Sequence, residues 1–364
     1  MGNNTFGITL KMTTWGESPG KAIGLILDNF PSGVTISEKE LNHDLSFRAP
    51  GKNKFISPRR EQDKAKILSG TFQGKTTGAP ISILIYNKKV DSQKYHPIKN
   101  LLKPGHANFT YLEKYQIFDY RGGGRASARE TACRVIAGYF AKKILQIHNI
   151  QVLSYLHSLG PIILSKQNLS NPKQLKKKIL SDPIFCPHPK TSLKMQNYLC
   201  TIIDEGDSIG GIIQSFVFNL PPGLGSPIYN KLNACLAYAI MSIPGAKGIE
   251  FGSGFFSCKM KGSEHNDKFI LKKEKISTKT NHSGGILGGI STGNTIDLKV
   301  AFKPTSSIKK PQQTLSLNLK EALFLTPKGS KHDPCIAIRA VPVVHSMICW
   351  VLADAIITQR CTRI

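Results

Sequence analysis

The sequence predicts an α+β fold in which antiparallel sheets pack against long helices. Several runs alternate apolar and polar residues as β-strands do, and runs with the helical spacing of apolar residues lie between them. The strand-like runs lack the regular strand–helix–strand spacing of a parallel, doubly wound sheet. Because no linker or long repeat divides the 364 residues, we expect a single domain spanning residues 1–364.

Three runs are predicted to be strands. In the run 295–302, alternate positions are apolar and share one face: Ile296, Leu298, Val300 and Phe302. Ile81–Tyr86 and Gly211–Phe218 show a similar alternation. A strand that is apolar at every second residue can pack one face on a core while its other face meets polar surroundings. We therefore expect each run to belong to a sheet.

A helix is predicted after Pro227, because proline is favoured near the first turn of a helix. The apolar residues that follow form one helical stripe: Leu232, Leu236, Ala239 and Ile243. Residues 166–190 are instead rich in Lys, Pro, Asn and Ser, a composition typical of connecting segments. For these residues we expect an exposed excursion from the fold.

The C-terminal stretch 341–358 is apolar enough to be considered as a membrane span. His345 and Asp354 interrupt it, and Pro342 stands where a helix would begin, so a buried helix is expected. The N-terminus has no apolar signal core. The eight cysteines show no CxxC pair and no metal-binding spacing, which indicates reduced thiols. We expect a cytoplasmic protein with no membrane partner and no metal.

The chain is strongly basic, with 49 Lys and Arg, 23 Asp and Glu, and a net charge of +26. Such a balance attracts polyanions and speeds the capture of small anions. Lysine runs such as residues 176–178 are typical of a solvated surface. The chain lacks the motifs and aromatic platforms of nucleic-acid-binding proteins, so we expect no nucleic acid as a partner.

The segment 119–131 is the strongest candidate for a binding site. Its glycines, Gly122 to Gly124, let the backbone turn tightly and approach a ligand. Ser127 and Glu130 have the spacing of a capping box before a helical pattern, and a helix N-terminus attracts anions. Three cations surround it: Arg121, Arg125 and Arg129. The segment is either a phosphate site or an ordinary capped helix with solvated arginines.

Three other segments concentrate chemically useful side chains. His106 follows the Pro104-Gly105 turn and would titrate near neutral pH, although a lone histidine is often a surface residue. The block 303–307 offers one lysine and three hydroxyls to a phosphate, or it is a polar strand end. Asp333 is either a general base or a turn-capping residue. The chain has neither a P-loop nor a dinucleotide-binding glycine motif.

Ordered blocks of sequence resemble the chorismate synthase family from residue 7 to residue 354. These blocks include Thr14-Trp15-Gly16-Glu17-Ser18, Gly74-Lys75-Thr76-Thr77-Gly78, Lys103-Pro104-Gly105-His106, Arg121-Gly122-Gly123-Gly124-Arg125, Lys303-Pro304-Thr305-Ser306-Ser307 and His332-Asp333-Pro334-Cys335. So many blocks in one order leave little room for chance. The resemblance implies a layered fold with helices sandwiched between antiparallel sheets, assembled as a homotetramer.

The resemblance also implies a reaction. Members of the family eliminate phosphate and a C6 hydrogen from 5-enolpyruvylshikimate 3-phosphate to give chorismate. They require reduced FMN although the reaction has no net redox change. Because the chain has no NADPH fingerprint and no added reductase domain, we expect the flavin to be reduced by an external flavin reductase or another reductant. Substrate and FMN are both anionic, which suits the basic composition.

Roles for individual residues follow from the resemblance at matching positions. The implied catalytic residues are His106, which would protonate the reduced flavin, Asp333, which would lie near flavin N5, and Ser18 and Ser127. The implied substrate contacts are Arg48, Lys54, Arg129 and Arg134. The implied flavin contacts are Arg125, Ala126, Ser127, Pro244, Gly245, Gly288, Lys303, Pro304, Thr305, Ser306, Ser307 and Lys331.

The chain departs from the family pattern at several positions. Pro19 stands where the family has a histidine that is assigned as proton donor to the departing phosphate. Lys54, Ala126 and Lys331 replace Arg, Ser and Arg, and His345 replaces Glu. Lysine keeps the charge of arginine but loses its planar fork. The departures leave two readings open: an active enzyme, and an impaired homologue that retains ligand binding.

Overall fold

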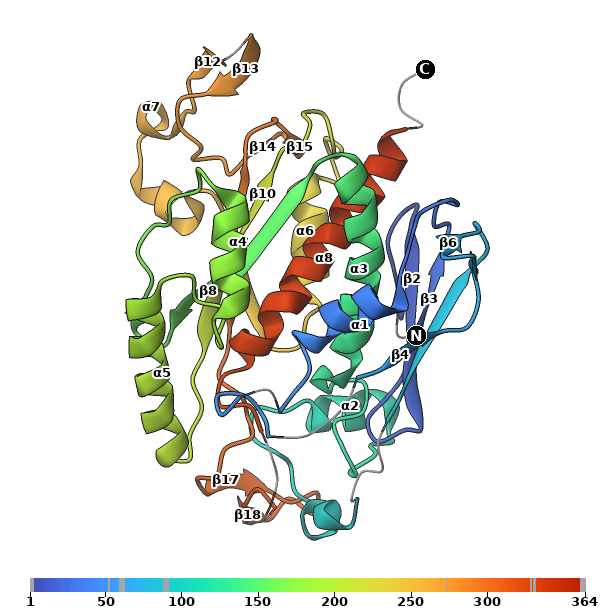
Figure 1. Ribbon diagram of the computed structural model, residues 1–364. Coiled ribbons are helices and arrows are strands. Elements are labelled where there is room, and N and C mark those ends of the chain that lie inside the picture. The colour runs from blue at the N-terminus through green and yellow to red at the C-terminus, as the bar shows by residue number, and fades with distance from the viewer. Residues whose placement is uncertain are drawn as a thin grey trace.

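The computed structural model describes residues 3–51, 53–58, 63–87, 92–272, 274–327, 329 and 332–360. Two five-stranded sheets and the helices around them make up most of the fold (Figure 1). The strand pairs that the structure describes are all antiparallel. The predicted α+β class with antiparallel sheets is therefore confirmed.

The first sheet has the strand order β1-β2-β3-β7-β4. Its strands are β1 (Thr5–Phe6), β2 (Lys11–Gly16), β3 (Ala22–Asp28), β4 (Ala65–Ile67) and β7 (Ile81–Tyr86). β7 has the predicted bounds, and its alternate residues Ile81, Ile83 and Ile85 are buried. The small hairpin of β5 (Thr71–Phe72) and β6 (Lys75–Thr76) follows β4, and α1 (Glu38–Ser46) packs against β4.

The second sheet has the strand order β11-β16-β10-β8-β9. Its strands are β8 (Gln151–Leu159), β9 (Ile162–Ile163), β10 (Gly211–Phe218), β11 (Ala246–Phe251) and β16 (Ile296–Phe302). β10 has the predicted bounds, and β16 begins one residue later than predicted. In β16 every second residue is buried, as the alternation predicted. The buried face of this sheet packs on the central helix layer.

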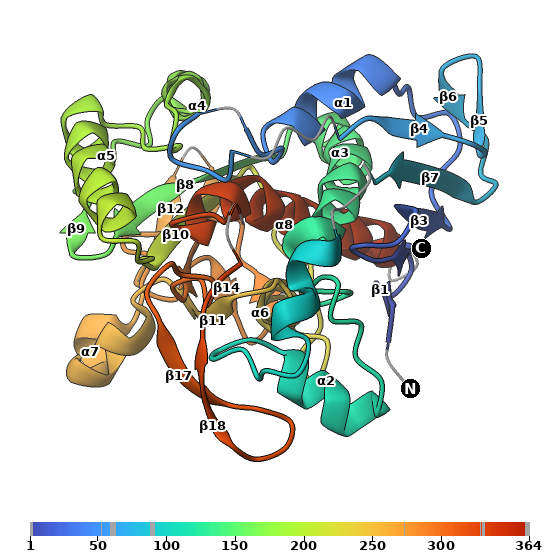
Figure 2. The same cartoon turned by 90° about the horizontal axis from the view of Figure 1, so that it is seen from below.

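Two long helices, α3 (Thr131–Ile147) and α8 (Ile336–Gln359), lie side by side between the two sheets (Figure 2). Their backbones approach closely at Gly138, where an added Cβ would lie only 2.2 Å from Cβ of Ser346. A larger residue than glycine would therefore force the helices apart. This arrangement confirms the expected sandwich of central helices between antiparallel sheets.

Helix α8 is long and apolar enough to cross a membrane, but 78% of its most apolar stretch is buried inside the fold. The prediction of a buried helix over 341–358 is confirmed. The predicted start at Pro342 is wrong, because α8 begins at Ile336 and contains the proline. The carboxylate of Asp354 accepts hydrogen bonds from three backbone N–H groups of the N-terminal segment, those of Ile8, Thr9 and Leu10.

Two predictions about the middle of the chain need correction. Helix α6 (Leu232–Met241) begins five residues after Pro227, and Ile243 is buried just beyond its end. The segment 166–190 is not simply an exposed excursion, because it contains α4 (Pro172–Ser181), whose Leu175 and Ile179 are buried. Asn171 caps this helix and proline occupies its first position, a start signal that the composition obscured.

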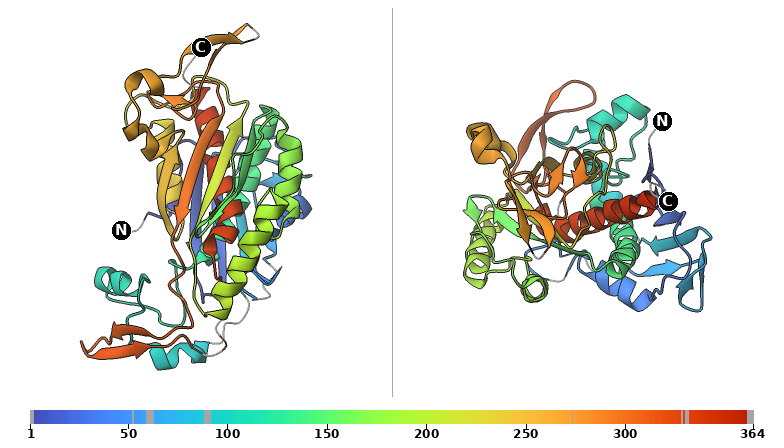
Figure 3. Two further views of the ribbon diagram at one scale, coloured as in Figure 1. Left: turned by 90° about the vertical axis from the view of Figure 1, so that its left-hand side faces the viewer. Right: turned by 90° about the horizontal axis from the view of Figure 1, so that it is seen from above.

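The remaining elements lie around the sandwich. They are α2 (Asn108–Tyr115), α5 (Pro189–Asp204), α7 (Gly262–His265), the 3₁₀ turns η1 (Ser92–Ile98), η2 (Ala128–Glu130) and η3 (Gly254–Lys259), and the hairpins β12 (Phe269–Lys272) with β13 (Lys275–Thr278), β14 (Ile286–Leu287) with β15 (Ile290–Ser291), and β17 (Gln312–Leu315) with β18 (Glu321–Phe324). Figure 3 shows the β12–β13 hairpin and the β17–β18 hairpin at opposite ends of the molecule. The segment before α2 joins the β17–β18 end, because Leu101 bridges to Ser316.

Candidate active site

A cavity of about 1210 Å³ lies where the loop before α3, the start of α8, the end of β16 and the segment before α2 meet. Its described lining carries more cations than carboxylates. The cations are Arg48, Lys103, Arg121, Arg125, Arg129, Arg134, Lys303 and Arg339, and the carboxylates are Glu17, Asp119, Glu130 and Asp333. Such a lining favours a ligand with several negative charges, because the cations offset the mutual repulsion of those charges.

The glycine loop before α3 forms one wall of the cavity. Ser127 caps the 3₁₀ turn η2, where its Oγ accepts a hydrogen bond of 3.3 Å from the N–H of Arg129. Helix α3 itself begins at Thr131. The predicted capping box is wrong, because Glu130 pairs with Arg134 one turn further on, at 3.0 Å, instead of reaching back to Ser127. The backbone of this loop still faces the cavity.

Arg125 ties the glycine loop to the first sheet. Its guanidinium donates to the carbonyl of Gly16 at 2.9 Å and to Oγ1 of Thr14 at 2.7 Å. Ser18 is held beside the loop, because its carbonyl accepts a 2.8 Å hydrogen bond from the N–H of Gly124. Both Arg125 and Ser18 line the cavity, so β2 and the glycine loop form one continuous wall.

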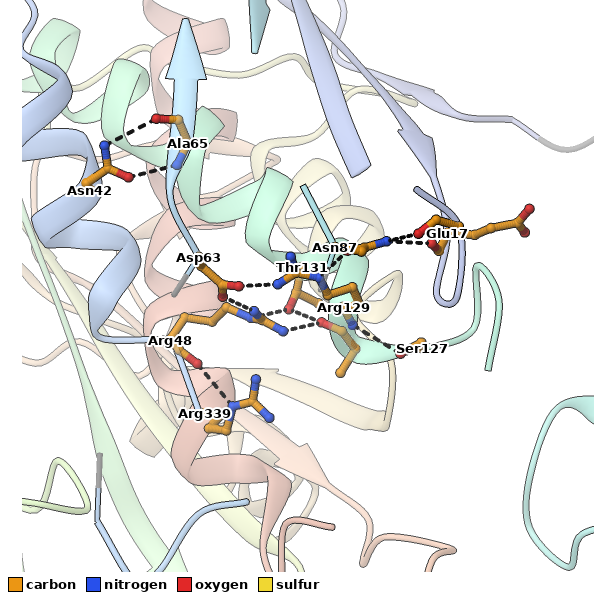
Figure 4. A network of polar contacts seen from close by, with 12 residues as sticks. Glu17, Asn42, Arg48, Asp63, Ala65, Asn87, Ser127, Arg129, Thr131 and Arg339 are labelled. Carbon is orange, nitrogen blue, oxygen red and sulfur yellow. Dashed lines mark hydrogen bonds and ion pairs between the residues drawn. The ribbon is translucent and has the colours of Figure 1, made fainter. Parts of the chain in front are cut away.

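A buried carboxylate joins two of the predicted substrate arginines (Figure 4). Asp63 Oδ2 lies 2.6 Å from Nη1 of Arg48, and its other oxygen pairs with Arg129. Arg48 also donates from Nε to Thr131 at 3.1 Å and from Nη2 to the carbonyl of Ala128 at 2.8 Å. Arg129 donates from Nε to Asn87 at 2.8 Å. The network therefore fixes η2 to the part of the first sheet where β4 begins and β7 ends.

Burial and charge act in opposite directions on Asp63. Burial alone would raise the pKa of this carboxyl, but the charges of Arg48 and Arg129 outweigh the burial and hold the pKa below its usual value. Asp63 is therefore ionised at neutral pH. With two guanidinium groups on one carboxylate, the cluster keeps an excess positive charge at the cavity wall. Substrate contact by Arg48 and Arg129 remains a prediction.

Asp333 is also held firmly, at the start of α8. Its Oδ1 accepts a 2.7 Å hydrogen bond from the N–H of Ser57, and its Oδ2 lies 2.8 Å from Nη1 of Arg339. Arg339 donates from Nε to the carbonyl of Arg48 at 3.0 Å, which links this pair to the Asp63 network. The carboxylate has a fixed orientation in the cavity wall, as a positioned reacting group requires.

His106 projects from a turn that its sequence predicted. The N–H of His106 donates to the carbonyl of Lys103 at 3.2 Å, and Gly105 has a positive φ of 65°. Proline and glycine at the two central positions are typical of a type II turn. The ring atom Nδ1 is buried without a hydrogen-bond partner. Burial, followed by the charges of Lys103 and Lys303, lowers the pKa of His106 to about 4.

Most of the predicted site residues come together here. Besides those described above, the predicted site residues that line the cavity are Ala126, Arg134, Pro244, Gly245, Lys303, Pro304, Thr305, Ser306 and Ser307. Two predicted residues lie outside the lining. The exposed ammonium of Lys54 lies 5.2 Å from the centre of the Phe55 ring, and Gly288 forms the turn of the β14–β15 hairpin. Lys331 falls outside the described residues.

Three residues that organise the site were not predicted from the sequence: Asp63, Lys103 and Arg339. Lys103 was named only as part of the block that contains His106. Asp63 carries no local signal, because its partners lie far away in the sequence. Arg339 does carry one, since it is a charged residue near the start of a mostly apolar helix. A charge in such a position is normally paired. The cavity as a whole can hold phosphate and carboxylate groups beside an imidazole and a row of hydroxyls.

Comparison with known proteins identifies similar chains. Residues 10–357 match the sequence model of the family described as chorismate synthase. A chorismate synthase of Protochlamydia amoebophila is 51% identical over 363 residues, which cover 99% of each chain. A chorismate synthase of Archaeoglobus fulgidus is 43% identical over 356 residues, which cover 98% of each chain.

A solved structure titled "Crystal Structure of Chorismate Synthase" has a similar fold, with a TM-score of 0.77. It is 30% identical in sequence, and the match covers 97% of this chain and 93% of that chain.

Proposed function

Because the chain belongs to the chorismate synthase family, we propose that its cation-lined cavity is the site where 5-enolpyruvylshikimate 3-phosphate loses phosphate to become chorismate. The chain is accordingly a carbon–oxygen lyase of aromatic amino acid biosynthesis. In the reaction the C3–O bond to phosphate and the C6–H bond break, and a new C=C bond completes the diene. The single observation that supports this site best is the convergence of Arg125, Ser127, His106 and Asp333 on one cavity.

The residues of the cavity fit a phosphorylated flavin, and members of the family use a flavin. Lys303 and the three hydroxyls of 303–307 suit a phosphate or the polar edge of a ring, and the buried, unpartnered Nδ1 of His106 offers a site for a further hydrogen bond. We infer that the cofactor is reduced FMN. When bound, it supplies electron density as phosphate leaves and recovers that density with the C6 hydrogen.

The protein's own groups then have three tasks. The arginines beside the glycine loop neutralise the phosphate as it departs, because fixed cations stabilise charge that develops in the transition state. The Asp333 carboxylate is held at a fixed place by Arg339 and Ser57. His106 holds or gives up a proton at the flavin edge. We further infer a homotetramer, an external reductant and a cytoplasmic location, all from family resemblance.

An active enzyme is favoured over the impaired homologue, since a chorismate synthase that is 51% identical matches this chain over 99% of both lengths. The direct test is anaerobic turnover of 5-enolpyruvylshikimate 3-phosphate with chemically reduced FMN, followed by the absorbance of chorismate. Asp333→Ala in the same assay is the negative control. If wild-type protein binds both ligands but forms no chorismate, the protein is the impaired homologue instead.

We expect FMN to bind roughly 5- to 150-fold more tightly when the phosphorylated substrate is present. The two ligands would share the cavity, so each orders the loops that the other contacts. Isothermal titration of FMN with and without substrate measures the ratio. Equal affinities in the two titrations would show that the ligands do not share the cavity in this way.

We expect Pro19→His to raise kcat about tenfold or more. Proline has no proton to give to the departing phosphate, whereas a positioned imidazole does. Position 19 adjoins Ser18 in the cavity wall and packs against the glycine loop, where an added Cβ on Gly122 would lie 3.3 Å from Cδ of Pro19. Pro227→His, at an exposed position outside the lining, is the matched control. A kcat that Pro19→His does not raise would mean that another group protonates the phosphate.

A further inference from the structure

The side chain of Asn87 joins two parts of the cavity wall (Figure 4). Its amide nitrogen donates to the carbonyl of Glu17 at 3.0 Å and to the carbonyl of Gly20 at 2.7 Å, and its amide oxygen accepts from Nε of Arg129 at 2.8 Å. A primary amide has two N–H donors and one acceptor oxygen, so a single orientation of the side chain serves all three partners. Asn87 lies outside the described lining of the cavity, to which Glu17 and Arg129 belong.

The two donated hydrogen bonds hold the segment 17–20 at both of its ends. This segment contains Ser18, which lines the cavity, and Pro19. The glycine loop holds the same segment at a third point, because the carbonyl of Ser18 accepts the 2.8 Å hydrogen bond from the N–H of Gly124. The place of the segment therefore depends on the amide of Asn87 as well as on the glycine loop.

The backbone of Asn87 is held independently of its side chain. Asn87 directly follows β7, and its N–H donates to the carbonyl of Lys21 at 3.0 Å, which continues the pairing of β7 with β3 by one residue. Arg129 likewise keeps a second contact, the ion pair of its Nη1 with Asp63. A substitution of the Asn87 side chain should therefore leave the sheet intact and act on the segment 17–20.

We propose that Asn87 is a positioning residue that fixes the segment 17–20 against Arg129. The two N–H donors of the amide carry this role, since each reaches one end of the segment. The inference rests on the proposed function in its consequence for turnover: with the departing phosphate beside Arg129, a displacement of the segment by about 1 Å can cost about 10²-fold in rate. The placement of the segment does not depend on the reaction.

The first experiment is hydrogen exchange of the Gly124 N–H, followed by NMR in the ligand-free protein, since protection of this amide reports its bond to Ser18. Asn87→Asp keeps an acceptor for Arg129 but puts an oxygen where the two donors were. We expect the Gly124 amide to exchange at least about tenfold faster, as the loss of two hydrogen bonds predicts. Asn42→Asp, in which an amide that bridges α1 and β4 outside the lining loses its donors in the same way, is the matched control and should exchange as wild type does.

Asn87→Leu removes the donors without adding a charge, and it should also speed the exchange of the Gly124 amide. If only Asn87→Asp has this effect, the added charge is responsible and the proposal is wrong. Wild-type exchange in both variants would overturn it as well. Because the exchange experiment uses no substrate and no flavin, its result is independent of whether the proposed reaction is correct.

The second experiment compares kcat with thermal unfolding. Asn87→Leu should lower kcat by up to about 10²-fold and should unfold close to the wild-type temperature. In this background Pro19→His should bring little gain, because the new imidazole would no longer be held at a set place. Faster exchange without a fall in kcat would contradict the positioning role, and a fall in the unfolding temperature that parallels the loss of kcat would replace it with a structural one.

Discussion

Asp63→Asn is expected to lower the free energy of unfolding by about 3–5 kcal/mol, the usual result of breaking a buried ion pair. The substitution keeps the shape of the side chain but leaves the guanidinium groups of Arg48 and Arg129 without their shared carboxylate. Arg48 is only 2% exposed, so water cannot replace the lost partner. Urea unfolding at pH 7, followed by circular dichroism, measures the change.

The pH dependence of this effect has a definite sign. Because the pKa of Asp63 is lower in the folded protein than in the unfolded chain, the carboxylate stabilises the fold above the unfolded pKa, which is about 3.9. That stabilisation is lost as the pH falls through the lower, folded pKa. The difference between wild type and Asp63→Asn should therefore be largest at neutral pH and should narrow below about pH 4.

Asp207→Asn provides the matched control, because Asp207 is partly exposed and forms an ion pair with the exposed Lys310. Exposed pairs contribute little to stability, so this variant should unfold almost as wild type does. Equal, small effects of the two substitutions would show that the Asp63 cluster is hydrated and does not hold the cavity wall.

The sequence predicted those parts of the fold whose signals are local. Alternation marked β7 at its observed bounds, because a one-residue shift would turn the apolar side chains to the other face. The bounds of β10 were also predicted, although this strand is buried on both faces along its middle. The start of α8 was misplaced because Pro342 suggested a beginning. A proline within a long helix costs one backbone hydrogen bond, and packing on every side of α8 compensates for that loss.

Most residues of the site could be predicted, but the ion pairs and hydrogen bonds between them could not. Family resemblance named Arg48 and Arg129, yet the carboxylate that joins them comes from a different segment and has no motif of its own. The capping box failed because a second partner, Arg134, competes for Glu130 at the favourable i,i+4 spacing. Side-chain pairing of this kind is decided by three-dimensional proximity, which the order of residues does not specify.

His106→Ala is expected to lower kcat by about 10²- to 10⁴-fold, the usual contribution of a positioned acid or base. The imidazole lies at the cavity with Nδ1 buried and unpartnered, so it is available to exchange a proton with a ligand. Its backbone, by contrast, is fixed by the turn and by the hydrogen bond from Nζ of Lys303 to the carbonyl of Gly105, which the substitution leaves in place. The loss should therefore fall on kcat and not on folding.

Single-turnover kinetics with reduced FMN, together with thermal unfolding, separate these two effects. His106→Ala should unfold close to the wild-type temperature, because the lost ring makes no hydrogen bond through Nδ1. His148→Ala, an exposed histidine at the end of α3, is the matched control and should retain full activity. A variant that loses activity and stability together would assign His106 a structural role. A variant that keeps wild-type turnover would assign the flavin's proton to another group. Asp333 would then be the first candidate to examine, since Ser57 and Arg339 hold its carboxylate at a fixed place in the cavity wall.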